Sequence, residues 1–150
     1  MALKQRVDED LKAALLERHQ FVTLVLRGLK SAILDEEITQ NKRETGLSDD
    51  EIEKIVAREV KKRNEAAALY DQNLRQDSAA DERREADILS QYLPEQMSEA
   101  EIKTVVDAKI AELGATDMKM MGQVIAAVKA DVGTAADGAT VAKIVKQTLN

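Results

Sequence analysis

Apolar residues recur every three or four positions along most of the chain, which is the spacing of amphipathic helices. The stretch over residues 21–38 is apolar on more than one side, as is typical of a helix packed between neighbours. A polar loop over residues 41–47 separates it from the next helical stretch. The stripes of the first and third stretches are Leu3, Val7, Leu11 and Leu15, and Ile52, Val56, Val60, Ala67, Tyr70 and Leu74. The pattern therefore predicts three helices before residue 75.

Capping residues and the single proline mark where helices begin and end. Ser48 and Glu51 have the spacing of a capping box, in which each side chain bonds the backbone of the other, so the third helix is expected to start there. A shorter fourth helix is expected from about Ala79. It should end near Leu93, because Pro94 disfavours helical geometry in the residue before it.

Residues 94–97 are the best candidate for a domain boundary. Directly afterwards, Ser98 and Glu101 repeat the capping-box spacing and open a fifth helix, which Gly114 stops. Asp117 and Asp137 are placed to cap a sixth and a seventh helix, the seventh following a turn over residues 133–138.

The predicted fold is all-α. An N-terminal helical domain of about four helices, residues 1–94, is joined to a three-helix C-terminal domain, residues 97–150. The joint is a predicted hinge at Tyr92, Leu93 and Pro94.

Composition supports helices and narrows the chemistry. One proline and six glycines leave little turn material for an all-β fold. No cysteine is present, which excludes disulfides, thiolate nucleophiles and cysteine zinc sites, and one histidine makes a His-rich metal site or a serine triad hard to build. No cofactor or metal is predicted. No apolar run approaches the roughly 18 residues of a membrane span, so a cytoplasmic protein without a membrane role is expected.

Charge argues against general nucleic-acid binding. The net charge is −6, and residues 76–150 carry 8 basic and 13 acidic groups, a net of −5. Non-specific binding comes mainly from phosphate neutralisation, which this balance does not favour, so DNA is not an expected partner. An RNA contact needs a local basic patch.

Several short segments together form a recognisable signature. They are LRGLKSAI at 26–33, EVKKRNE at 59–65, ILSQYLPEQ at 88–96, MGQV at 121–124 and ADG at 136–138. These segments resemble the YqeY-like family and occur in its order over nearly the whole chain. The string at residues 88–96 looks like the family's hinge and is followed by its helix start.

That family is similar to the tail of the B subunit of the tRNA-dependent amidotransferase, which converts glutamate or aspartate on mischarged tRNA to the amide. The resemblance implies a helical N-terminal domain and a three-helix, tRNA-contacting C-terminal domain. It implies no catalysis by the chain alone, which would be at most an accessory to a carbon–nitrogen ligase with glutamine as amido donor. Family members often carry Lys or Arg where this chain has Gln123 and residues 133–135.

Two groups of cations are candidate nucleic-acid ligands. Arg58, Lys61 and Lys62 share a helical face with Arg63 adjacent, and could neutralise several phosphates. The alternative is a solvated face in which neighbouring acids pair with them. In the C-terminal domain the resemblance implies that cations, together with the N-terminal ends of the sixth and seventh helices, face phosphate; the alternative is ordinary solubility. These cations are Lys119, Lys129, Lys143 and Lys146.

Other chemistry-bearing residues have simpler explanations. His19 is expected at the surface or at a helix cap, because the sequence indicates no base or nucleophile beside it. The acids at residues 49–53 lie in a first helical turn, where negative charge is favoured anyway. The methionines at 118, 120 and 121 are expected to fill core space, with a soft binding surface as the alternative.

Three functions remain open from the sequence. The first is a non-catalytic module bound to tRNA or to a tRNA-handling enzyme. The second is a protein–protein adaptor without nucleic acid, favoured by the acidic balance. The third, an amide-transferring enzyme, is disfavoured because the chain has no Cys, no Ser–Lys signature and no ATP-binding loop.

Overall fold

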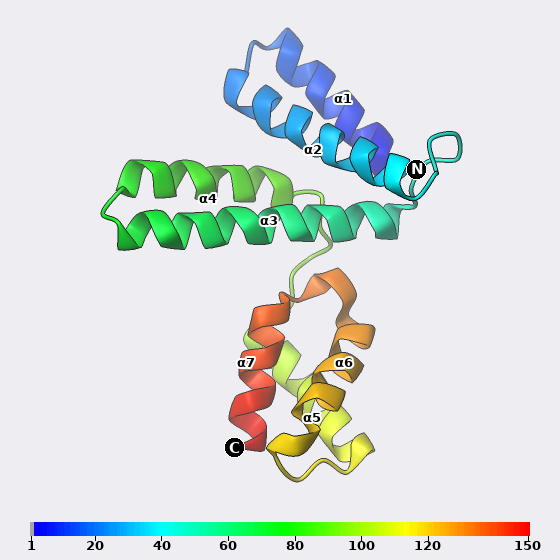
Figure 1. Ribbon diagram of the computed structural model, residues 1–150, viewed down its shortest axis with the longest axis vertical. Coiled ribbons are helices and arrows are strands. Elements are labelled where there is room, and N and C mark those ends of the chain that lie inside the picture. The colour runs from blue at the N-terminus through cyan, green and yellow to red at the C-terminus, as the bar shows by residue number, and fades with distance from the viewer. Residues whose placement is uncertain (1) are drawn as a thin grey trace. The chain divides into compact units, whose positions relative to one another are not determined.

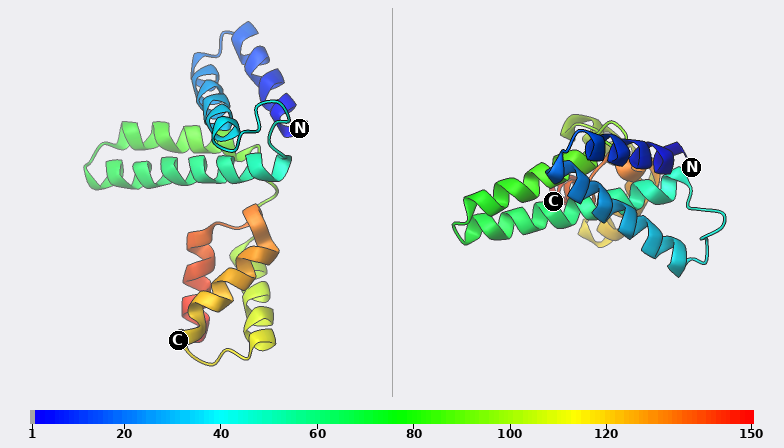
Figure 2. Two further views of the ribbon diagram at one scale, coloured as in Figure 1. Left: turned by 45° about the vertical axis from the view of Figure 1, so that its right-hand side comes forward. Right: turned by 90° about the horizontal axis from the view of Figure 1, so that it is seen from above.

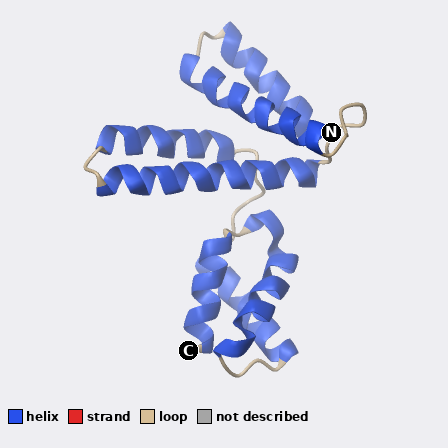
Figure 3. Ribbon diagram, in the orientation of Figure 1, coloured by secondary structure: helices blue, strands red, loops and turns tan. Residues whose placement is uncertain are grey.

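The computed structural model describes residues 2–150 and confirms the predicted all-α class. Over these residues the chain forms seven α-helices and two short 3₁₀ turns, with no strand (Figures 1 and 3). Contacts group the chain into two compact units, Met1–Leu93 and Pro94–Asn150. The division falls inside the predicted hinge. Independent folding of residues 1–94 and 97–150 stays a prediction, as does the hinge itself. None of the described helices is long and apolar enough to cross a bilayer.

The N-terminal unit consists of two helical hairpins. Its helices are α1 (Ala2–Leu16), α2 (Gln20–Thr39), α3 (Asp49–Gln72) and α4 (Gln76–Ser90). Helix α1 lies beside α2, and α3 lies beside α4 along much of its length (Figures 1 and 2). The connections after α1 and α3 are tight and pass through left-handed residues, Arg18 and Leu74.

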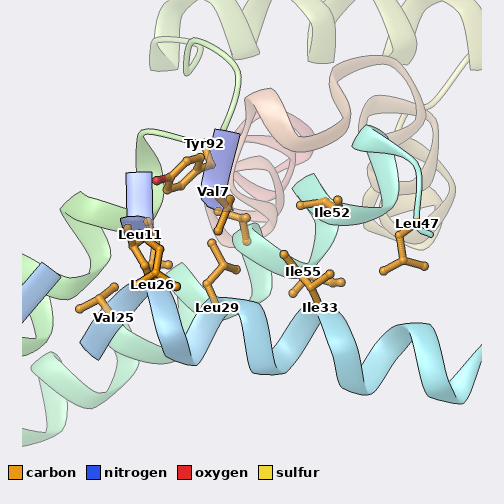
Figure 4. Packing of buried hydrophobic residues seen from close by; sticks show 12 residues of the cluster. Val7, Leu11, Val25, Leu26, Leu29, Ile33, Leu47, Ile52, Ile55 and Tyr92 are labelled. Atoms are coloured by element: carbon orange, nitrogen blue, oxygen red, sulfur yellow. The ribbon is translucent and has the colours of Figure 1, made fainter. Parts of the chain in front are cut away.

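Aliphatic side chains from all four helices form the core of this unit. From α2, Leu26, Leu29 and Ile33 point toward residues of α1 and α3, including Val7 and Ile55 (Figure 4). Each of these side chains is nearly inaccessible to water. Burial of such side chains contributes about 1.5–3 kcal/mol each, so packing rather than helix propensity holds the hairpins together.

The C-terminal unit is a three-helix bundle with its own core. It contains α5 (Glu99–Leu113), η1 (Met118–Met120), α6 (Met121–Val132), η2 (Gly133–Ala135) and α7 (Gly138–Leu149). The predicted caps are present: Ser98 and Glu101 form the capping box of α5, and Asp137 accepts from the Thr140 amide at the start of α7. Gly114 ends α5 with φ of 63°, a left-handed conformation that favours glycine. The core residues are Ile102, Val106, Ala115, Val124, Val128, Val141, Ile144 and Val145.

Some local predictions differ from the structure. Leu15 is exposed, because residues four apart drift by about 40° around a helix at each step, and Ala14 is buried instead. Leu74 lies beyond the end of α3 in the turn to α4 and is 87% exposed. Helix α4 ends at Ser90, before Leu93. Asp117 caps η1, which precedes α6.

Candidate nucleic-acid interface

The outward face of α3 carries a stripe of exposed cations. Helix α3 buries Ile52, Ile55 and Val56 against the core, and Arg58, Lys61 and Lys62 are exposed. The three cations follow the helical repeat at i, i+3 and i+4, so they share one side of the helix. The structure therefore brings these three predicted residues together.

Lys54 extends this stripe by one helical turn. It precedes Arg58 by four residues on α3, and it is exposed. Over the described residues, neither Lys54 nor Arg58 has an acidic ion-pair partner. Lys61 Nζ lies 4.0 Å from Glu65 Oε1, and Lys62 Nζ lies 3.4 Å from Glu59 Oε1. We call Lys54, Arg58, Lys61 and Lys62 the basic face. Lys54 is not among the residues predicted from the sequence, although its i, i+4 spacing from Arg58 is a signal that could have identified it.

Arg63 lies apart from the basic face. Its guanidinium is partly buried between α3 and α4, where Nη1 donates to the Glu59 carboxylate and Nε lies 3.6 Å from Glu85 Oε2. Burial, followed by the neighbouring acids Glu82 and Asp81, raises the pKa of Glu85. Arg63 thus joins the two helices of a hairpin and is less available to a phosphate than its neighbours.

The four predicted cations of the C-terminal unit do not form one cluster. Lys119 precedes α6 and Lys129 lies near its other end, so most of the helix, which is about 18 Å long, separates them. Lys143 on α7 lies 3.5 Å from the Glu99 carboxylate. Lys146 is exposed one turn further along α7.

The N-terminal ends of α6 and α7, which the resemblance implies face phosphate, do not lie side by side. The chain reverses between these helices through η2, so α6 and α7 run in opposite directions (Figure 1). Their N-terminal ends therefore lie at opposite ends of the unit. The side chain of Lys129 instead approaches Gly138, and its Nζ lies 3.3 Å from the position of a Cβ built there.

The turn before α7, where the resemblance leads us to expect cations, forms backbone hydrogen bonds instead. In the turn before α7, the Thr134 and Ala135 carbonyls accept hydrogen bonds from the Gln96 side chain, at 3.0 Å, and the Met97 amide, at 2.8 Å. Gln123 is exposed on α6. This turn therefore fastens the start of the C-terminal unit and presents no cation of its own.

The remaining sequence candidates lie in ordinary structural environments. His19 is exposed at the N-cap of α2 and forms no side-chain cap bond. Met120 and Met121 pack against the C-terminal core, whereas Met118 is exposed. Across residues 2–150, no group of acids and histidine has the geometry of a metal site. Tyr92 is buried in the core of the N-terminal unit, with Leu93 packed against that core and Pro94 beginning the next unit.

A hollow of about 310 Å³ lies between α1 and α2, and its charges are largely paired with one another. Lys4 Nζ donates to the buried Glu37 carboxylate at 2.6 Å. Lys30 Nζ lies 2.7 Å from Asp8 Oδ1. These two ion pairs bridge the helices, so the hollow offers a ligand little unpaired charge beyond Arg43 on its rim.

One comparison with known proteins finds a match. A family model described as Yqey-like protein matches residues 4–149. No curated protein matches the chain.

Proposed function

Because the chain belongs to the YqeY-like family, we propose that it is a non-catalytic helical module that binds tRNA through the basic face of α3. The family match covers nearly the whole chain but specifies no activity. The observation that carries the proposal is the exposure of Lys54, Arg58, Lys61 and Lys62 along one side of a single helix.

The basic face suits a phosphate backbone better than it suits a base. Its four cations extend over two turns of α3, about 12 Å of helix, and two of them have no acidic partner in the described chain. No aromatic side chain lies among them to stack on a base. Contacts of this kind release counterions, so we expect binding to weaken steeply with salt, with at most about four ions released.

The test is a titration of the protein into labelled bulk tRNA at low and near-physiological salt. The informative variant is the double reversal Arg58→Glu/Lys61→Glu. Its matched control is Lys12→Glu/Arg43→Glu, which changes net charge equally at two exposed cations of the same unit. The wild type should bind saturably, the test variant should lose about tenfold or more in affinity and about two released ions, and the control should stay near wild type.

Two outcomes contradict the proposal. If the wild type does not bind tRNA even at low salt, the chain is not a tRNA-binding module. If both double variants lose affinity equally, net charge and not the basic face governs the interaction.

A protein–protein adaptor without nucleic acid is the second candidate. It is favoured by the ion pairs that several lysines of the C-terminal unit form with acids. Lys103, Lys109 and Lys143 are each paired with acids of the C-terminal unit. With a net of −5 over residues 76–150, this half of the chain repels phosphate. Partners recovered equally with and without nuclease treatment would support the adaptor, whereas nuclease-sensitive recovery would contradict it.

A further inference from the structure

The side of α2 that faces away from the core carries apolar residues at a regular spacing. Leu24, Leu34 and Ile38 are 69%, 40% and 54% exposed, although each is a large aliphatic side chain. With Arg27 and Ser31, which are also exposed, they follow a repeat of three and four residues. This spacing is typical of the seam along which one helix packs against another. We call these five residues the α2 seam.

No helix of the same unit covers the α2 seam, although Ser31 and Leu34 also line the edge of the hollow between α1 and α2. The core residues Leu26, Leu29 and Ile33 leave α2 on its other side, toward α1 and α3 (Figure 4). A Cβ added at Gly28, beside the seam, would meet no atom within 4 Å. The backbone of another helix could therefore approach this position closely.

Residues of the α2 seam, together with the adjacent Asp35, are complementary about Ser31. Leu24 and Ile38 each lie seven residues from it, and both are large and apolar. Arg27 and Asp35 each lie four residues from it, with opposite charges. Both of these charged side chains are exposed, and within the described chain neither forms an ion pair.

We propose that α2 packs against α2 of a second copy of the chain, in antiparallel orientation about a two-fold axis beside Ser31. In this arrangement, residues equally far from Ser31 on either side lie at the same height along the helix pair. Leu24 then packs on the partner's Ile38, Arg27 pairs with the partner's Asp35, and each of these contacts occurs twice. Ser31 is small enough to face its own copy on the axis.

Charge complementarity selects this occupant. A parallel pairing in register would place Arg27 beside Arg27 and Asp35 beside Asp35, and like charges in contact are unfavourable. Pairing one helix face from each copy buries less surface than a typical stable interface does. The dimer is therefore expected to form and dissociate with protein concentration.

The experiment measures molar mass by sedimentation over a wide range of concentrations. The wild type should move toward twice the mass of the chain as concentration rises. Arg27→Asp and Asp35→Arg should each weaken dimerisation about tenfold or more, because each places like charges opposite one another. The control Lys12→Asp changes an exposed cation of α1 and should behave as the wild type.

Mixing the two single variants is the decisive step. The Arg27→Asp chain has an acid at both positions and the Asp35→Arg chain has a base at both. Opposite charges therefore face each other at both contacts of a mixed dimer, which should form where each variant alone stays monomeric. Circular dichroism of each variant confirms that it is folded. A monomeric wild type at every concentration, single variants that dimerise like the wild type, or a mixture that stays monomeric would each overturn the proposal.

Discussion

Glu51 holds together the start of α3 and the loop before it. Its carboxylate accepts a hydrogen bond from the Ser48 amide at 2.8 Å, which completes the capping box, and another from Lys42 Nζ. The Lys42 bond, followed by the Ser48 amide, lowers the pKa of Glu51 from 4.5 to about 2. The charged form of one side chain thus secures both the helix terminus and its loop.

The lowered pKa predicts how stability depends on pH. The pKa of Glu51 in the folded chain lies below its unfolded value, so its contribution is present above pH 4.5 and is lost as pH falls toward about 2. We expect Glu51→Gln to lower the free energy of unfolding at neutral pH and to flatten its pH dependence between those values. Urea unfolding at a series of pH values measures this. A Glu51 carboxyl that titrates near 4.5 by NMR in the folded chain would contradict it.

Single residues show which part of the basic face could be predicted. Spacing alone places Arg58, Lys61 and Lys62 on one side of a helix, and the structure agrees. Spacing could not reveal that Arg63 turns toward Glu85, because that contact depends on which helix packs beside α3. The sequence contains the acid but not its distance from the guanidinium.

At the scale of elements, Tyr92 fastens the end of α4 to α1. Its ring is buried in the core of the N-terminal unit, and its hydroxyl donates to Asp10 Oδ2 at 2.6 Å. The Arg6 guanidinium lies 4.9 Å from the ring centroid and donates to the Gln91 carbonyl at 3.1 Å. Burial, then the hydrogen bond to Asp10, raises the pKa of Tyr92.

Removing this hydroxyl should loosen the junction without emptying the core. Tyr92→Phe keeps the ring and loses the bond to Asp10, so we expect a loss of about 1 kcal/mol in the free energy of unfolding. The control is Tyr70→Phe, whose hydroxyl has no hydrogen-bond partner over residues 2–150 and which should change stability little. Urea unfolding of these two variants, of Asp10→Ala and of Tyr92→Phe/Asp10→Ala gives the coupling energy between Tyr92 and Asp10. Additive losses for Tyr92 and Asp10 would contradict a direct bond between them.

Helix starts could be predicted better than helix faces. Ser48 and Ser98 predict the first turns of α3 and α5 correctly, because a capping box is a local arrangement within four residues. The inward side of a helix depends on distant partners. Leu15 and Leu74 continue an apolar spacing but are exposed: Leu15 has drifted off the buried side of α1, and Leu74 lies beyond the end of α3.

At the scale of the whole molecule, the all-α class and the division near Pro94 could be predicted, but helix direction in the C-terminal unit could not. Composition, period and caps are properties of the chain itself. The opposite directions of α6 and α7 follow from the reversal of the chain at η2. They separate the N-terminal ends of the two helices, for which the sequence predicts the same kind of cap. Because α6 is about 18 Å long, a single phosphate cannot contact the N-terminal ends of both helices.

Two separate cores predict two unfolding transitions. No residue is shared between the core of the N-terminal unit and that of the C-terminal unit. Each unit also has a capping box of its own, at Ser48 and at Ser98. We expect Ser48→Ala and Ser98→Ala to cost about 1 kcal/mol each, and each to shift only the transition of its own unit. The variants thus label which transition belongs to which unit.

Denaturant unfolding followed by amide NMR distinguishes the units residue by residue. The C-terminal unit has the smaller core, so it should unfold first, and a loss of about 1 kcal/mol is a large part of the stability of so small a domain. Expressed alone, residues 97–150 should keep the amide spectrum that they have in the full chain. If both serine variants shift every residue together, the chain unfolds as one cooperative unit. Residues 1–94 and 97–150 would then be two groups of helices within a single domain, since a shared transition requires that neither core persists without the other.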